Sequence, residues 1–216
     1  AGWAVGIHYR SSKHDAEALR AEIEAIGGKA ALLQADLSQS ACLDGLVADC
    51  AARLGAPLCL INNASEFLPD TVLSTDEAIW DTHLDVNLKA PVFLAKALAR
   101  HLPAHSSGNI INIIDQRVWR LTPDFFSYTI SKAGLWTATR TLAQGLAPRI
   151  RVNAIGPGPV LRSVHQTDED FETEAQSTLL HKGPSTDEIT AAVRFILSSP
   201  SMTGQMIALD GGQHLT

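Results

Sequence analysis

Short apolar segments alternate with longer amphipathic ones along this chain, and this alternation restricts the possible folds most strongly. Strands of a parallel sheet that follow one another through helices need right-handed crossovers, with helices on both faces. We therefore predict an α/β fold: a Rossmann-like, doubly wound, mainly parallel sheet in three layers, as one domain over residues 1–216. The expected strands are residues 4–9, 30–34, 58–62, 109–114, 150–155 and 205–209.

Helices are expected between these strands, from the 3.6-residue spacing of apolar side chains and from terminal signals. Ser74 and Glu77 have the spacing of a capping box, as do Ser185 and Glu188, and Pro91 predicts a kink within a long helical region. We expect every strand to be buried on both faces, because the runs are apolar throughout. The expected helices are residues 15–26, 38–54, 74–98, 126–146, 163–176 and 185–197.

The charge of the chain excludes some classes of partner. With a formal net charge of −6 and a pI near 5.7, a surface built for nucleic acid or for anionic lipid is not expected. No apolar run reaches the length of a membrane span and no leader is recognised, so a soluble cytoplasmic protein is predicted. Three cysteines without CxxC spacing predict reduced, mostly buried thiols, and the eight histidines show no metal-binding spacing, so no metal is assigned.

The residues that follow the predicted strands lie where open α/β sheets bind their ligands, and most of these segments carry polar side chains. A cation with hydroxyl groups, as at Arg10 and Ser11, can hold a phosphate, and the carboxylate of Asp36 can accept from an adenine amine. The candidate site positions after the strands are Tyr9, Arg10, Ser11, Asp36, Leu37, Asn63, Ala64, Ser65, Asp115, Pro157 and Gly158.

A second candidate feature is the pair Tyr128 and Lys132, four residues apart in a predicted helix. This spacing places the phenol and the ammonium on one helix face. A neighbouring cation favours phenolate, so we expect a lowered pKa for Tyr128 and a role in proton transfer.

These motifs, taken in order, resemble the short-chain dehydrogenase/reductase family over essentially the whole chain. The resemblance rests on Asn62-Asn63-Ala64, on Asn87 within Asp-Val-Asn-Leu, on Tyr128-x-x-x-Lys132, on Arg151-Val-Asn153-Ala with Pro157-Gly158, and on Asp210-Gly211-Gly212. It implies a Rossmann fold and a nicotinamide cofactor, with Tyr128 as acid/base. Lys132 would hold the nicotinamide ribose, Asn87 would organise a water-linked relay to Lys132, and Val160 would join the cofactor-binding residues.

The chain departs from most of the family at Asp115, which stands 13 residues before Tyr128, where a serine is usual. An ionised carboxylate only accepts hydrogen bonds and would repel a developing alkoxide, so ordinary ketone reduction is less expected. Pteridine reductases of the family look similar here. They share an Asp at this position and segments like His8-Tyr9-Arg10-Ser11, Asn62 to Phe67 and Gly156-Pro157-Gly158.

That resemblance implies hydride transfer to a C=N bond of a dihydropteridine or dihydrofolate-like substrate. Phe67 would stack on the pterin, Ser65 would contact the substrate, and Asp115 with Tyr128 would deliver protons. Arg10, Ser11 and Ser12 stand where NAD-selective relatives place an acid, so the expected cofactor is NADPH.

Purely structural roles for the same residues remain open. Phe67 could be an ordinary half-buried core aromatic, and Asp115 could cap a loop or pair with Arg117 or Arg120. Arg10 could be a solvated charge at a strand end. At the level of function, the alternatives are a carbonyl or alcohol dehydrogenase and a non-catalytic relative that only binds a ligand.

The glycine-rich turn of the family has no match in the chain and would precede Ala1. We expect a further strand, this turn and most of a helix there, about 20 to 25 residues for one βα unit. Family resemblance also implies a homotetramer or homodimer packed through residues 84–98 and 126–146. The region 163–180 is expected to form a substrate lid.

Overall fold

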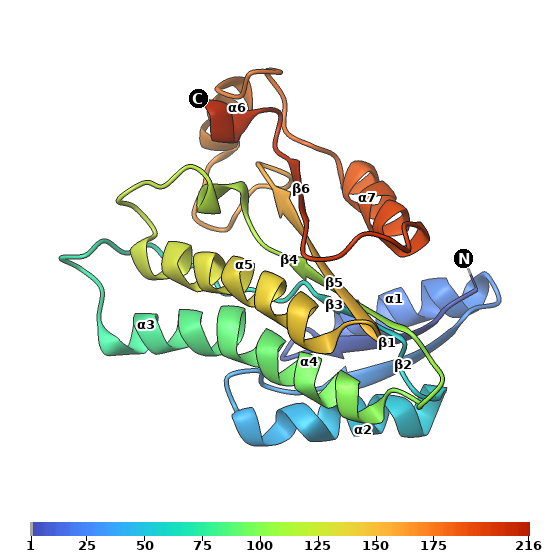
Figure 1. Ribbon diagram of the computed structural model, residues 1–216. Helices are drawn as coiled ribbons and strands as arrows, with labels where there is room; N and C mark the ends of the chain where they lie inside the picture. The colour runs from blue at the N-terminus through green and yellow to red at the C-terminus, as the bar shows by residue number, and fades with distance from the viewer. Residues whose placement is uncertain (1) are drawn as a thin grey trace.

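The computed structural model describes residues 2–216 and shows strands alternating with helices (Figure 1). The strands are β1 (Ala4–Tyr9), β2 (Lys29–Gln34), β3 (Cys59–Asn62), β4 (Gly108–Ile113), β5 (Ile150–Pro157) and β6 (Met206–Leu209). The helices are α1 (Lys13–Ala25), α2 (Leu43–Leu54), α3 (Glu77–Leu84), α4 (Ala90–His101), α5 (Phe126–Leu146), α6 (Asp168–Gln176) and α7 (Thr186–Ser198). None of these helices is both long and apolar enough to cross a bilayer.

Every strand pair is parallel, as the alternation predicts, but the described strands form two sheets. β1 pairs with β2, and β3, β4, β5 and β6 pair in that order. Val5 on β1 and Ile61 on β3 are 36% and 45% exposed, so the expectation that every strand is buried on both faces is wrong for these two strands. The further strand expected before Ala1 lies outside the described residues.

The larger sheet is the middle of three layers. On one face Ile110 and Val152 pack against α4 and α5, and on the other Ile111 and Ile155 pack against Ile196 of α7. All five side chains are completely buried. Burial of this kind stabilises a fold by about 1.5 to 3 kcal/mol per large aliphatic side chain. The sheet is therefore a fixed platform for the residues at its carboxyl ends.

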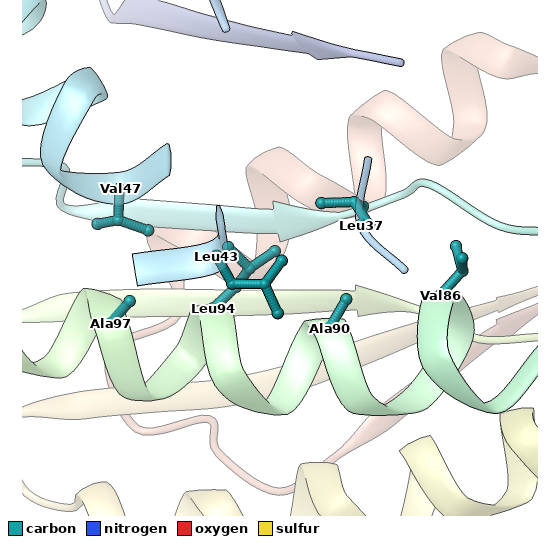
Figure 2. Close-up of a cluster of buried hydrophobic side chains, with 7 residues drawn as sticks. All are labelled: Leu37, Leu43, Val47, Val86, Ala90, Leu94 and Ala97. Carbon is teal, nitrogen blue, oxygen red and sulfur yellow. The ribbon is translucent and has the colours of Figure 1, made fainter. Parts of the chain in front are cut away.

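A separate apolar cluster packs α2 against α4. Leu43 and Val47 of α2 point towards Ala90, Leu94 and Ala97 of α4, and Leu37 and Val86 close one end of the cluster (Figure 2). Small residues on α4 allow α2 to lie close against it. Leu37 and Val86 also lie beside the polar positions after β2 and β3, so this packing helps to position them.

Of the two predicted capping boxes, one was correct and one was wrong. The Ser185 and Glu188 box caps α7 as predicted. The cap of α3 is instead Asp76, whose carboxylate accepts from the Ile79 N–H, whereas Ser74 accepts from the Thr71 N–H within the preceding loop. Near Pro91 the structure has a wide π turn over Asp85–Lys89, which places the irregularity just before the proline.

Candidate active site

The carboxyl ends of β1, β2 and β3 surround a pocket of about 320 Å³. A dinucleotide is bound at this position in doubly wound sheets. The pocket brings together most of the predicted cofactor residues from three separate segments of the chain. Its lining consists of His8, Tyr9, Arg10, Ser11, Ser12, Asp36, Leu37, Ala64, Ser65, Glu66 and Val86.

The donors in this pocket fit a phosphorylated adenosine. Arg10 and the hydroxyl-bearing Ser11 and Ser12 all line this pocket, a combination suited to a 2′-phosphate. Asp36 is fixed by the backbone N–H and hydroxyl of Ser38, which both donate to Oδ1, and these bonds lower the pKa of Asp36. Arg10 forms an ion pair with Glu66 across the pocket, so a phosphate here would compete with that carboxylate.

The predicted acid/base group lies at the carboxyl end of β4. The Tyr128 hydroxyl donates to Asp115 Oδ2 at 2.9 Å, while Asp115 Oδ1 accepts from the Arg117 N–H at 2.8 Å. The buried ammonium of Lys132 donates to the Ile113 carbonyl at 3.0 Å. Asp115 thus caps a turn with one oxygen, as the alternative structural role allowed, and contacts Tyr128 with the other.

Burial dominates the acid–base behaviour of this group. It raises the pKa of Asp115, against the opposing effects of the Arg117 N–H and guanidinium, Tyr128 and Lys132. Burial, followed by the charge and hydrogen bond of Asp115, raises the pKa of Tyr128 well above its usual value. Burial also lowers the pKa of Lys132 to about 8, although Asp115 acts in the other direction. The expected lowering of the Tyr128 pKa by Lys132 is therefore wrong for this structure.

Asn87 has a well-defined structural position. It lies in the π turn, completely buried, and its Oδ1 accepts from the Glu66 N–H at 2.8 Å. Its Nδ2 donates to the Glu66 carbonyl and to Ser131 Oγ. These bonds tie the loop after β3 to α5. The Ser65 hydroxyl also donates to Asn87 Oδ1, at 3.2 Å. The relay role of Asn87 stays a prediction.

Phe67 lies beside Tyr128, but one of its faces is covered. The Phe125 ring stacks on it, with centroids 4.1 Å apart and planes 8° apart, and Tyr128 meets it edge-on at 4.7 Å. Phe125 caps α5 with a left-handed backbone, φ 54°, which is uncommon for a bulky residue. His165, in the predicted lid, has Nε2 3.0 Å from the Phe67 carbonyl, which accepts from it.

The loop at the end of β5, residues 157–160, packs closely against Gly183 and Asp210. A Cβ on Gly158 would meet Asp210 at 2.8 Å, and a Cβ on Gly183 would meet the Pro159 carbonyl oxygen at 1.8 Å. Asp210 in turn accepts from the N–H groups of Gly212 and His214. Asp210-Gly211-Gly212 therefore holds the loop that carries the predicted cofactor residues Pro157, Gly158 and Val160.

The sequence interpretation missed a buried polar group behind the site. His83, Ser127 and Asp70 form a hydrogen-bonded chain beside Tyr128. One signal could have indicated it, because His83 stands four residues before Asn87 and so shares its helix face. No signal in the sequence indicates that Phe125 would stack on Phe67.

Taken together, the parallel strands, the pocket at the carboxyl ends of β1, β2 and β3 and the buried Tyr128–Lys132 pair define a dinucleotide-binding oxidoreductase. Within residues 2–216, no three His, Cys, Asp or Glu side chains gather closely enough to hold a metal ion.

Comparison with known proteins agrees with this class. The family described as enoyl-(acyl carrier protein) reductase matches residues 1–214, and the chain belongs to the short-chain dehydrogenase/reductase family. The crystal structure of FolM alternative dihydrofolate reductase 1 from Brucella suis in complex with NADP is 50% identical, with a TM-score of 0.97 over 100% of this chain and 86% of that one.

Two curated relatives differ in their described activities. Dihydromonapterin reductase from Shigella sonnei is 29% identical over 99% of this chain and 92% of its own length. 3-Oxoacyl-[acyl-carrier-protein] reductase from Synechocystis sp. is 29% identical over 98% of this chain and 87% of its own length. The predictions of a single Rossmann-like fold, of an oxidoreductase and of a nicotinamide cofactor are confirmed.

Proposed function

We propose that this protein is an NADPH-dependent reductase of a pteridine or dihydrofolate-like substrate with a conjugated C=N bond. The observation that carries the proposal is the hydrogen bond between Tyr128 and Asp115, in place of the tyrosine and serine of most relatives. Similarity to the Brucella and Shigella enzymes supports the same substrate class.

The chemistry of the pair suits a nitrogen heterocycle. Reduction of C=N adds a hydride to carbon and a proton to nitrogen, and the bound nicotinamide would supply the hydride. Asp115, with its raised pKa, can be neutral closer to neutral pH than an exposed aspartate and can give a proton to a ring nitrogen. When ionised, it can instead accept from ring N–H groups. Tyr128 is hydrogen-bonded to it and can pass a proton within the pair.

The cofactor preference follows from the pocket after β1 and β2. We expect Arg10, Ser11 and Ser12 to bind the 2′-phosphate and Asp36 and Leu37 to border the adenine. Asn63, Ala64, Ser65, Pro157, Gly158 and Val160 would border the rest of the cofactor, with Lys132 at the nicotinamide ribose. Phe67 would stack on the substrate once Phe125 moved from its ring.

Three further predictions belong to this proposal. Residues 163–180 would act as a substrate lid, which the contact between His165 and Phe67 supports. The protein would be a cytoplasmic homotetramer or homodimer. Exposed Phe93 on α4 is consistent with packing between subunits through residues 84–98 and 126–146.

A second candidate is a carbonyl reductase, which the 3-oxoacyl reductase relative favours. A non-catalytic ligand-binding relative is disfavoured because Tyr128, Lys132 and Asn87 are all present and buried. A single assay separates the three: NADPH oxidation, followed by its absorbance, with dihydrobiopterin, dihydrofolate and a panel of ketones. We expect turnover of a pterin or folate. Brisk ketone reduction without pterin turnover would establish the second candidate, and no turnover of any acceptor would support the third.

A further inference from the structure

A chain of four hydrogen-bonding groups runs behind the active site, from the loop after β3 to the start of α5. The Leu68 N–H lies 2.9 Å from His83 Nε2, and His83 Nδ1 lies 2.7 Å from Ser127 Oγ. Ser127 Oγ donates to Asp70 Oδ2 at 2.5 Å, and the Ser127 N–H also points at that carboxylate. His83 and Ser127 are completely buried and Asp70 is 4% exposed.

The donors and acceptors fix the tautomer of His83. A backbone N–H can only donate, so Nε2 must be the unprotonated nitrogen and Nδ1 must carry the proton. Nδ1–H then donates to Ser127 Oγ, whose own hydrogen is directed at Asp70. Neutral His83 therefore satisfies every member of the chain, whereas a second ring proton would face the Leu68 N–H.

The electrostatics agree with a neutral ring. Burial lowers the pKa of His83; the charges of Asp70 and Glu66, on the loop after β3, oppose this effect, and that of Lys132, on α5, adds to it. Tyr128 of α5 meets the imidazole edge-on, with ring centroids 5.9 Å apart.

The hydrogen-bonded chain adjoins the two groups that we propose to meet the substrate, Phe67 and Tyr128. The N–H that His83 holds belongs to the Phe67–Leu68 peptide, and the carbonyl of the same peptide accepts from His165. Ser127 directly precedes Tyr128, and the Phe67 and Tyr128 rings are 4.7 Å apart. His83 is thus bonded to the backbone of one group and to the residue adjoining the other.

We infer that His83 is a positioning residue, which sets the Phe67 ring against the Tyr128 hydroxyl through Leu68 N–H on one side and Ser127 on the other. The inference rests on the proposed reductase function of the site, but not on the identity of its substrate. A side chain that acts in this way should affect the reaction step more than the binding of the cofactor, whose 2′-phosphate and adenine we place in the separate pocket at Arg10 and Asp36.

The kinetic experiment compares His83→Leu, Ser127→Ala and the double variant, with whichever acceptor the enzyme reduces best. We expect kcat to fall about 10- to 100-fold in His83→Leu, as small misplacements of reacting groups do. The Kd for NADPH should stay within about twofold of wild type. Because both residues belong to one hydrogen-bonded chain, kcat of the double variant should be little lower than that of the worse single variant. Equal kcat in wild type and both single variants, or fully additive losses, would overturn the inference.

The matched control is Thr129→Val on the same helix. The Thr129 side chain is 7% exposed, and its hydroxyl finds no hydrogen-bond partner among the described residues. Removing that hydroxyl at nearly constant shape should leave kcat and the Kd for NADPH within about twofold. A loss in the control as large as in His83→Leu would contradict a specific role for His83, and Ser127→Ala serves if His83→Leu does not fold.

A second measurement needs no substrate. Nitrogen-15 NMR of the histidine side chains should show His83 as a neutral ring protonated at Nδ1, with that assignment lost in His83→Leu and altered in Ser127→Ala. A proton on Nε2 at neutral pH would overturn the inference whatever the substrate is. Absence of turnover with every acceptor would instead refute the proposed function, so the two failures are distinguishable.

Discussion

Tyr128 and Asp115 share one hydrogen bond 2.9 Å long, and the aspartate that accepts it is anchored by the Arg117 N–H on its other oxygen. This arrangement leaves the carboxylate little freedom to turn away from the phenol. A group fixed in this way is prepared for proton transfer before substrate arrives.

Removing either partner should affect the reaction more than the fold. We expect Tyr128→Phe to reduce kcat by about 10²- to 10⁴-fold, the usual contribution of a positioned acid. Asp115→Ser should lower pterin or folate turnover and raise turnover of ketones, because a serine hydroxyl donates to a carbonyl oxygen. Steady-state kinetics on both substrate classes tests this. Near-normal kcat in Tyr128→Phe would refute its role as acid.

The pH profile should follow from the buried lysine. The pKa of Lys132 is lowered to about 8, mainly by burial, so its ammonium is lost as pH rises through that value. The raised pKa of Asp115 acts in the same direction, since its protonated form becomes scarcer as pH rises. Reduction should therefore be fastest below pH 8 and decline above it. A profile of kcat/KM that is flat from about pH 6.5 to 9.5 would contradict this.

Cofactor selection should depend on the ion pair between Arg10 and Glu66. Arg10→Glu should shift preference from NADPH towards NADH, because the cation for the 2′-phosphate is replaced by an anion. Glu66→Gln should lower the Kd for NADPH by about two- to fivefold, since the carboxylate that competes with the phosphate is removed. Fluorescence titration with both cofactors measures these effects, with Arg20→Ala on α1 as a control. Unchanged selectivity in Arg10→Glu would exclude its phosphate role.

Substituting two glycines by alanine gives a matched pair of tests of the free energy of unfolding. Gly183→Ala places a methyl group against the Pro159 carbonyl oxygen, whereas Gly145→Ala in α5 meets no atom within 4 Å. We expect the free energy of unfolding to fall by about 1 to 3 kcal/mol for Gly183→Ala. It should rise by about 0.5 to 1 kcal/mol for Gly145→Ala, because alanine is the better helix former. Urea denaturation measures both, and a stable Gly183→Ala protein would show that the loop tolerates displacement.

The sequence predicted what depends on local pattern and on strand order. The helix containing Tyr128 and Lys132 was predicted over the residues that form it, and Arg10, Asp36 and Ser65 were correctly placed around one pocket, because parallel strands bring their carboxyl ends together.

What the sequence did not predict depends on side-chain contacts between distant segments. His83 is 44 residues from Ser127 and Asp70 is 57 residues from it, so no periodic pattern connects them. The direction of the Tyr128 pKa shift also depends on depth of burial, and local spacing suggested the opposite direction. The stacking of Phe125 on Phe67 depends on a left-handed backbone conformation that the sequence does not signal.

The wide turn over Asp85–Lys89 gives α3 and α4 different rotational settings within one continuous helical segment. Ala90, Leu94 and Ala97 face α2 after it, while His83, before it, is turned towards the loop at Leu68. Deleting one residue in the turn would restore a regular helix and rotate the two parts by about 100° relative to each other. The extra residue thus lets one continuous helical segment direct His83 towards the loop at Leu68 and the small residues of α4 towards α2.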